Sequence, residues 1–473
     1  MGRALPARAA RYRTVTFLAA ILPLCAGPTF GQAYTARGTT AGDIRLYVTN
    51  HGVLGNNFVF RTPSSFEYPA GTGYEHLTHA GLWLGARTAD ANGAFTGVVT
   101  GGKDQFPGNA TASLTEFSPL DVEINVRSSD PSSPRYSPLA LSDEEMVTLF
   151  DDHVPKAGSP EPHRPMSVTV RQITHGWNQP GYRDIVIVRY IVTSHASAPL
   201  GDLWVGLYSE LASGPKNNYS TWPPSGSWFH KKLIEWDPAW RMLREHYCAN
   251  LPVPAGCNFQ VVPPWVGVQL LTAPAPGRQV TLAAWSFAPG DPSRDEDTER
   301  YALMSAGTIA DLSAAELQPR DGDPTELLAT GPFQLEASGD SIEVAFALVG
   351  GADVPSLQQH ARTAQTLADH GYDLSVVGVT PASAVERIRI APVANPSASG
   401  DLEFLISLPR AEEVSVVLFD PFGRRIASQS FAGLSVGTHR VRLGAGRLAP
   451  GVYQVRVTDA RGSASTRVVQ LRR

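Results

Sequence analysis

Short apolar or alternating runs recur from residue 34 to about residue 352, and clusters of Gly, Pro, Asn, Asp and Ser separate them. Examples are "MSVTVRQITHGW", "DIVIVRYIVTS", "LGDLWVGLYSE" and "SIEVAFALVGG". Runs of this length and spacing are typical of strands and are too short for most helices. Their repetition predicts an all-β chain with a large antiparallel β-sandwich as its body.

One run indicates a central strand. In "DIVIVRYIVTS", Ile185, Ile187 and Ile191 share one face, and Val186 to Val192 at alternate positions form the other. Both faces are mostly apolar, which predicts a strand that is covered on both sides.

Composition supports the same fold class. The chain has 43 Gly and 38 Pro in 473 residues, and its 39 basic residues include only five Lys, so turns are frequent and Lys-rich helical faces are missing. One helix stands out in "DVPSLQQHARTAQTLADHG", with Asp353 as N-cap, Pro355 in the first turn and Gly371 at its end. We expect this helix to close the body at residues 34–371, followed by a linker at 372–385.

The first residues are typical of a secretory signal peptide. Arg3, Arg8, Arg11 and Arg13 precede the apolar run "VTFLAAILPLC", and small residues follow up to Ala33. The alternative is a buried N-terminal helix, in which four arginines would be poorly placed. We therefore expect residues 1–33 to be removed, and beyond them the sequence contains no apolar run long enough for a membrane span.

Export to an oxidising compartment favours disulfide formation between the remaining cysteines. Cys248 and Cys257 in "YCANLPVPAGCNF" are the two that remain after residue 33, and we expect them to form a disulfide. Two free, buried thiols are the alternative.

Residues 386–473 differ from the body in charge and in strand density. They carry 13 Arg and no Lys against seven acids, a net charge of +6, whereas residues 34–384 carry a net charge of −15. Seven strand-like runs in under ninety residues predict an immunoglobulin-like β-sandwich. In "FDPFGRR", Asp420-Pro421-Phe422-Gly423 has the residue types of a tight hairpin turn.

This C-terminal segment resembles the sorting domains of type IX secretion substrates and the related immunoglobulin-like domain of flagellar hook-capping proteins. The resemblance implies export across an outer membrane and either retention at the cell surface or release from it. Its Arg-rich composition differs from that family, and an adhesive immunoglobulin-like role stays open. The matching residues include Asp420, Gly423, Arg424, Gly451 and Tyr453.

The body resembles uncharacterised secreted bacterial proteins through stretches such as "EYPAGTGYEHLTHAGLWLGA" and "GPFQL". That group implies an architecture and no assigned activity.

Most of the common motifs for catalysis are missing. The sequence contains no H-E-x-x-H, no Walker loop and no dinucleotide fingerprint. His76 and His79, like His153 and His163, have no companion acids at metal spacing, so we interpret them as loop histidines. We expect no cofactor.

The acidic stretch "DPSRDEDTERY" offers Asp291, Asp295 and Asp297 as hard oxygen ligands for calcium. The spacing misses the EF-hand pattern, and a solvated acidic turn is the favoured interpretation.

Five of the nine tryptophans lie between residues 222 and 265, including Trp222, Trp228, Trp236 and Trp240. Exposed rings could stack on sugars or on a peptide, which makes the stretch 217–265 a candidate ligand-binding insertion. The favoured alternative is an insertion that uses the rings as its own small core. Glu235, Asp237 and Glu245 are nearby candidates for the paired carboxylates of a glycosidase.

The sequence therefore favours an exported, non-enzymatic bacterial protein, secreted or held on the outer surface of a Gram-negative cell. Its expected partner, reached through the C-terminal module, is a secretion translocon or an anionic surface glycan, and the acidic body makes nucleic acid an unsuitable ligand. The alternative is a secreted carbohydrate-binding protein or hydrolase that uses the 217–265 stretch.

Overall fold

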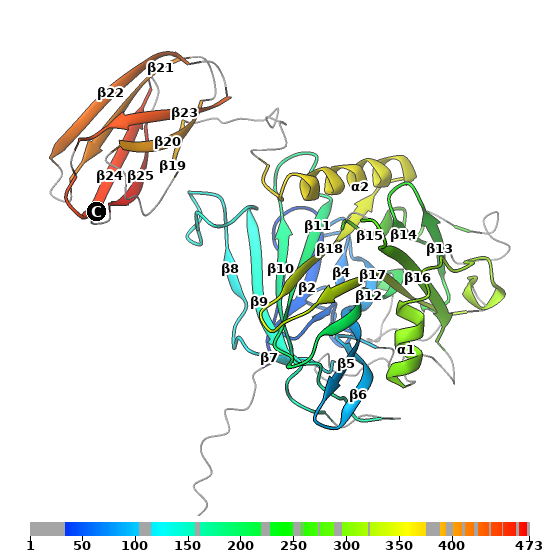
Figure 1. The fold of residues 1–473 in the computed structure, drawn as a ribbon. Helices are drawn as coiled ribbons and strands as arrows, with labels where there is room; N and C mark the ends of the chain where they lie inside the picture. The colour runs from blue at the N-terminus through cyan, green and yellow to red at the C-terminus, as the bar shows by residue number, and fades with distance from the viewer. Residues whose placement is uncertain are drawn as a thin grey trace, which may run out of the picture.

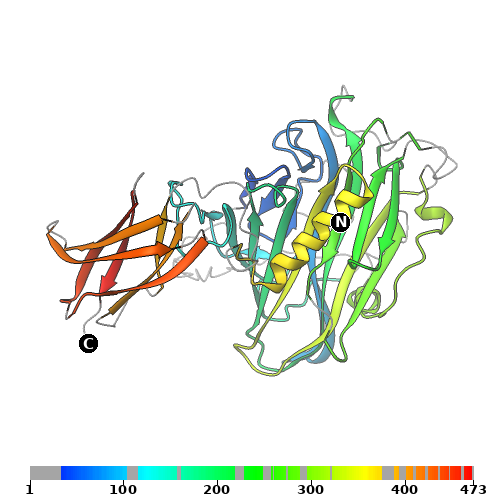
Figure 2. The ribbon, with the colours of Figure 1, turned by 90° about the horizontal axis from the view of Figure 1, so that it is seen from above.

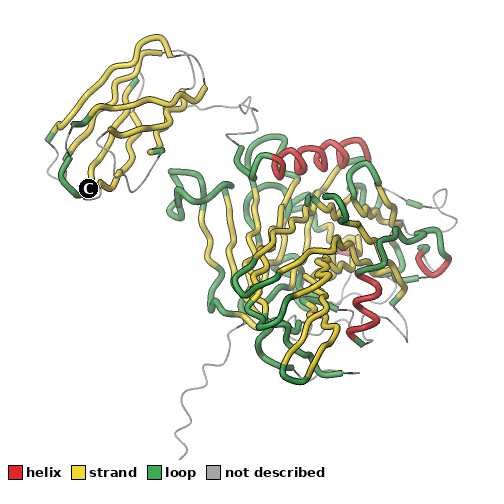
Figure 3. Tube along the Cα trace, viewed as in Figure 1, coloured by secondary structure: helices red, strands yellow, loops and turns green. Residues whose placement is uncertain are grey.

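The computed structural model describes residues 34–470 apart from short segments at 104–114, 157–160, 219–227, 249–256, 259, 273–274, 288–295, 320–321, 375–387, 394–400, 409–411, 421–423, 435–436, 447 and 460–462. The described chain is mostly β (Figure 3), as the sequence predicts. No helix in this part of the chain is long and apolar enough to cross a membrane.

The body contains two nine-stranded sheets (Figure 1). The main path of the first sheet runs β1-β2-β3-β5-β12-β17-β16, with β4 and β6 paired at its side. Its strands are β1 (Ala36–Gly38), β2 (Arg45–Thr49), β3 (Val53–Leu54), β4 (Phe66–Glu67), β5 (Tyr74–Asp90), β6 (Gly93–Thr100), β12 (Leu200–Pro215), β16 (Gln279–Ser286) and β17 (Pro324–Leu335).

The second sheet runs β13-β14-β15-β18-β11-β10-β9-β7, with β8 paired to β9. All the strand pairs of both sheets are antiparallel within the described residues. Its strands are β7 (Ser118–Pro119), β8 (Asn125–Arg127), β9 (Glu144–Asp151), β10 (Val168–Gly176), β11 (Ile185–Ser194), β13 (Lys232–Asp237), β14 (Met242–Tyr247), β15 (Trp265–Leu270) and β18 (Ser341–Gly351).

Strand β11 shows how the two sheets and the long helix are layered. Val186, Val188 and Tyr190 enter the core between the sheets, and Ile185 and Ile187 enter a second core under helix α2 (Val354–Asp369). Both faces are covered, as predicted from the alternation.

Helix α2 lies across the outer face of the second sheet (Figure 2). Its buried stripe consists of Leu357, Ala361, Ala364 and Leu367. Asp353 is its N-cap and forms a capping box with Ser356, and the predicted helix is confirmed. A second, shorter helix, α1 (Asp297–Met304), begins within the acidic stretch and was not predicted.

The strands after residue 388 form two further sheets with a core of their own. A three-stranded sheet runs β19-β20-β23 and a four-stranded sheet runs β22-β21-β24-β25. Their buried side chains, from Ile388 to Val468, belong to one cluster that contains no residue of the body. The strands are β19 (Arg389–Pro392), β20 (Asp401–Leu408), β21 (Glu412–Phe419), β22 (Arg425–Leu434), β23 (Gly437–Gly444), β24 (Gly451–Thr458) and β25 (Ser463–Gln470).

Candidate functional site

The described tryptophans of the 217–265 stretch do not form a stacking platform. Trp228 is only 1% exposed, lies edge-on to Phe58 at 5.5 Å and donates its indole N–H to the carbonyl of Ala212. Trp236 packs at the margin of the core between the sheets, and Trp240 packs under α2. Trp265 packs against the same cluster as Trp240, so the four described rings are divided among three apolar clusters. Trp222 lies outside the described residues.

The stretch also supplies strands to the body, because β13 and β14 form one end of the second sheet. The predicted disulfide between Cys248 and Cys257 is confirmed and closes the segment between β14 and β15.

The three carboxylates near this hairpin do not share a face. The register pairs Glu235 with Arg244 and Ile234 with Glu245, so Glu235 and Glu245 point to opposite sides of the sheet. Glu235 and Asp237 share one face, and both contact Arg244, at 2.8 and 3.5 Å. The two acids that share a face are therefore both ion-paired with one arginine, and Glu245 faces neither of them.

Of the three calcium candidates, Asp297 alone lies within the described residues. It begins α1, its carboxylate contacts Arg300 at 3.0 Å, and burial raises its pKa to about 6. In the part of the chain that the structure describes, no group of three or more His, Cys, Asp or Glu could hold a metal ion.

The structure places the C-terminal motif residues at one turn and one strand. Asp420 accepts hydrogen bonds from the backbone N–H and the Nε of Arg424, at 2.9 and 2.6 Å, and so closes the turn between β21 and β22. Gly451 begins β24, and the Tyr453 hydroxyl donates to the carbonyl of Ala449 at 2.8 Å. Gly423 lies outside the described residues.

A buried polar seam between the two sheets of the body is the feature that sequence reasoning missed. Its central part joins three strands: Ser213 of β12 contacts both His76 of β5 and Glu245 of β14. His76 Nε2 donates to the carbonyl of Tyr68 at 2.8 Å. All three side chains are fully buried.

Protonation of the seam follows from its bonds. Burial lowers the pKa of His76 to about 4, so the ring is neutral, and its single N–H must be on Nε2 because a carbonyl can only accept. The Ser213 hydroxyl has one proton for two partners, His76 Nδ1 and Glu245 Oε2, so one of the two contacts needs a proton from the partner. Burial raises the pKa of Glu245 to about 7, which keeps that proton on the carboxyl below this pH.

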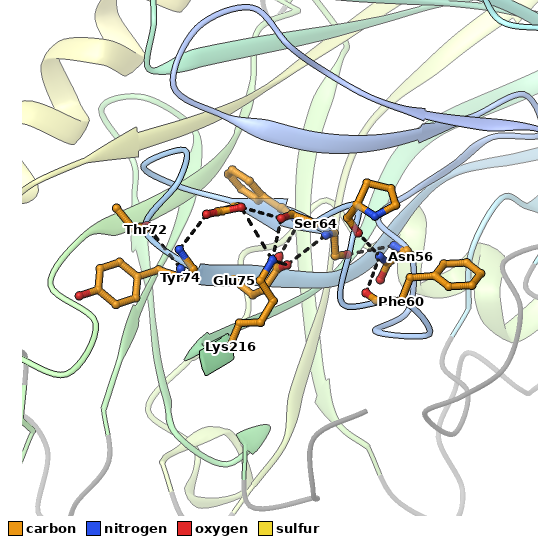
Figure 4. A network of polar contacts seen from close by, with 12 residues as sticks. Asn56, Phe60, Ser64, Thr72, Tyr74, Glu75 and Lys216 are labelled. Atoms are coloured by element: carbon orange, nitrogen blue, oxygen red, sulfur yellow. Dashed lines mark hydrogen bonds and ion pairs between the residues drawn. The ribbon is translucent and has the colours of Figure 1, made fainter. Parts of the chain in front are cut away.

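A second buried polar cluster surrounds Lys216 (Figure 4). The Lys216 ammonium donates to Ser64 Oγ at 2.7 Å and to Glu75 Oε1 at 2.9 Å. Glu75 Oε2 also accepts the backbone N–H of Phe66, and Glu67 accepts from Ser64 and from the backbone of Gly73. Burial raises the pKa of Glu75, while the charge of Lys216 opposes that shift.

Lys232 lies near Glu245, at one end of the seam. It is 1% exposed and its ammonium lies 3.1 Å from Asp323. Burial lowers its pKa, but the charges of Asp323, Glu326 and Glu210 outweigh burial and raise it. Burial holds the pKa of Glu326 well above its ordinary value. His79 lies on β5, 3.4 Å from Glu210, so its interpretation as a loop residue is wrong, as is that of His76 on the same strand.

The seam joins the two sheets. Its central side chains, Ser213, His76 and Glu245, are fully buried and contact one another. The alternation of β17 could have indicated it, since Glu326 shares the face of Leu328, which belongs to the core between the sheets.

No protein-family model matches this chain, and no curated protein matches it significantly. Solved structures with some likeness include a polysaccharide lyase, with 8% identity over 93% of this chain and 46% of that one at a TM-score of 0.25.

Another is a heparinase III gene product, with 8% identity over 67% of this chain and 28% of that one at a TM-score of 0.22. A third is the β-glucuronidase of Parabacteroides merdae, with 12% identity over 44% of this chain and 27% of that one at a TM-score of 0.15. The chain spans less than half the length of each, and likeness this distant carries no argument about activity.

Proposed function

We propose that this chain is an exported, non-enzymatic bacterial protein in which residues 386–473 direct secretion or surface attachment and the β-sandwich body is the part delivered. The proposed location is the surroundings or the outer surface of a Gram-negative cell. The observation that carries the proposal is the separate core of the C-terminal strands, whose buried cluster draws on residues from Ile388 to Val468 alone. A module with its own core is what a transferable signal requires.

Local geometry of the module supports this role. The bonds from Arg424 to Asp420 fix the turn on which the resemblance to sorting domains rests. The Tyr453 hydroxyl bonds back to the main chain four residues upstream, an arrangement similar to the tyrosine corner of immunoglobulin domains.

The four-stranded sheet offers the module a cationic outer face. The register aligns Arg425, Phe419, Gln454 and Arg467 in one row across the sheet. Arg456 lies in the next row, with its guanidinium 5.5 Å from the centre of the Phe419 ring. Arginines arranged around one aromatic ring suit an anionic partner such as a surface glycan or an acidic patch of a translocon.

The body supports a non-catalytic role. The centre of the seam is fully buried, and the described tryptophans of the 217–265 stretch pack in or against apolar clusters. The carbohydrate-binding or hydrolase alternative receives no specific support from these positions.

The test is a transplant of residues 386–473 onto a reporter that carries a signal peptide, together with deletion of the same residues from the full chain. We expect the reporter to reach the cell surface or the medium, and the truncated chain to stay in the periplasm. A transplant with Arg425, Arg456 and Arg467 all changed to Gln keeps the buried core and tests the cationic face separately. Unchanged export of the truncated chain would contradict the proposal.

A further inference from the structure

A cavity of about 140 Å³ lies at the edge of the second sheet, away from the seam. Its walls come from β8, the segment that follows β8, the start of β9 and the Thr40–Ala41 loop. The lining residues that matter here are Arg127, Ser128, Ser133, Arg135, Asp143, Glu144 and Asn178.

The acceptors of this cavity are already used. Glu144 accepts from the backbone N–H and the hydroxyl of Thr40 and from the backbone N–H of Ala41, at 2.6, 2.7 and 3.1 Å. Asp143 accepts the backbone N–H of Asn178 at 2.7 Å and the side-chain amide of Gln179 at 3.2 Å. Both carboxylates therefore serve to hold the walls together.

The donors, in contrast, keep spare capacity. Asn178 Oδ1 accepts the backbone N–H of Gly42, so the side-chain amide N–H groups remain as donors. Ser128 and Ser133 accept backbone N–H groups through Oγ, so each retains its O–H. Each of these side chains therefore offers the cavity a hydrogen-bond donor that has no acceptor among the described residues.

The two arginines supply the positive charge. Arg127 donates its Nε–H to Glu145, which fixes the side chain and leaves its two η nitrogens as donors for a ligand. The guanidinium of Arg135 has no ion pair or hydrogen bond within the described part of the chain. A planar guanidinium with free N–H groups is the preferred partner of a carboxylate, sulfate or phosphate group.

We infer that this cavity binds a small oxyanion, with Arg135, Arg127, Asn178 and the two serine hydroxyls as its donors. The volume is close to that of a protein cavity known to hold one benzene, so it suits an inorganic oxyanion or the acidic group of one sugar. The net negative charge of the body opposes anions at long range, which makes the site dependent on these direct hydrogen bonds.

The experiment is isothermal titration calorimetry of the full chain with potassium sulfate and with glucuronate, each against potassium chloride at equal ionic strength. We expect a Kd of about 1 mM or tighter for at least one oxyanion and no binding of chloride. R135Q should weaken binding about tenfold or more, because it removes a charge-assisted contact. Asn178→Asp should abolish binding, since it keeps the acceptor for Gly42 and replaces the amide donors by a carboxylate.

R171Q is the matched control, because Arg171 is exposed on β10 and does not line the cavity. Tighter binding of sulfate would identify a free inorganic ion as the ligand, and tighter binding of glucuronate would identify an acidic sugar; both support the site. The inference is overturned if neither oxyanion binds, if R135Q binds normally, or if R171Q loses as much affinity as R135Q.

Discussion

Glu245 is the residue at which the charge state of the seam depends most directly on pH. Its pKa is raised by burial to about 7 in the folded protein, above the ordinary value of 4.5. The folded state therefore binds this proton more tightly than the unfolded state, and the contribution to stability falls as pH rises from 4.5 to about 7, by about 1.4 kcal/mol per pH unit.

Glu245→Gln should remove that pH dependence, because the amide imitates the protonated carboxyl and can still donate to Ser213. We expect the variant and the parent to have similar unfolding free energies at pH 5, and the variant to be the more stable at pH 8. Urea unfolding at both pH values measures the difference. The same change at Glu235, on the opposite face of the hairpin, is the control, and parallel pH profiles for parent and E245Q would contradict the protonated chain from Glu245 to His76.

The contact between Lys232 and Asp323 provides a second prediction for the seam. Replacement by Met should cost about 3–5 kcal/mol of unfolding free energy, because it leaves the buried carboxylate of Asp323 without its counter-charge. The neighbouring Lys231 is partly exposed, so K231M should cost less than about 1 kcal/mol. Equal losses for the two variants in urea unfolding would show that Lys232 makes no special contribution.

At the scale of single elements, the disulfide between Cys248 and Cys257 joins the end of β14 to the approach to β15. It closes a loop with a sequence separation of nine residues, for which chain entropy predicts about 2–3 kcal/mol. Changing both cysteines to Ser should lower the unfolding free energy by that amount, and a reducing agent should have the same effect on the parent and none on the double variant. A parent that is insensitive to reduction would contradict this expectation.

The elements differ in how far sequence alone could predict them. Strand β11 and helix α2 were predictable because each carries its signal locally, in an alternation of period two and in a capped stripe of period 3.6. Helix α1 was not, because it is only 8 residues long and few apolar residues mark its buried side.

The candidate site was less predictable than the fold. The partners of His79 and His76 lie on β12, more than 130 residues along the chain, so spacing could not identify them. Trp228 illustrates the same limit, since its ring is buried against Phe58 from a distant segment.

The whole molecule is built as two sets of sheets with separate buried clusters, and this predicts separable folding. Residues 386–473 form their core from their own side chains, so the isolated segment should fold cooperatively, and the body from residue 34 to 385 should keep its disulfide and its seam. Calorimetry of the full chain should then show two transitions, each of which reappears in one of the two fragments.

The charges of the two parts sharpen this test. Residues 386–473 have a net charge of +6, and residues 34–384 have a net charge of −15. Any electrostatic attraction between the two parts therefore weakens as the salt concentration rises. If the parts are independent, both transitions keep their temperatures when the fragments are mixed at low salt. Two results would contradict this expectation: fragment 386–473 is unfolded alone, or the full chain shows a single transition that neither fragment reproduces. Either result would mean that the two cores depend on each other and that a transplanted module could not act as a signal.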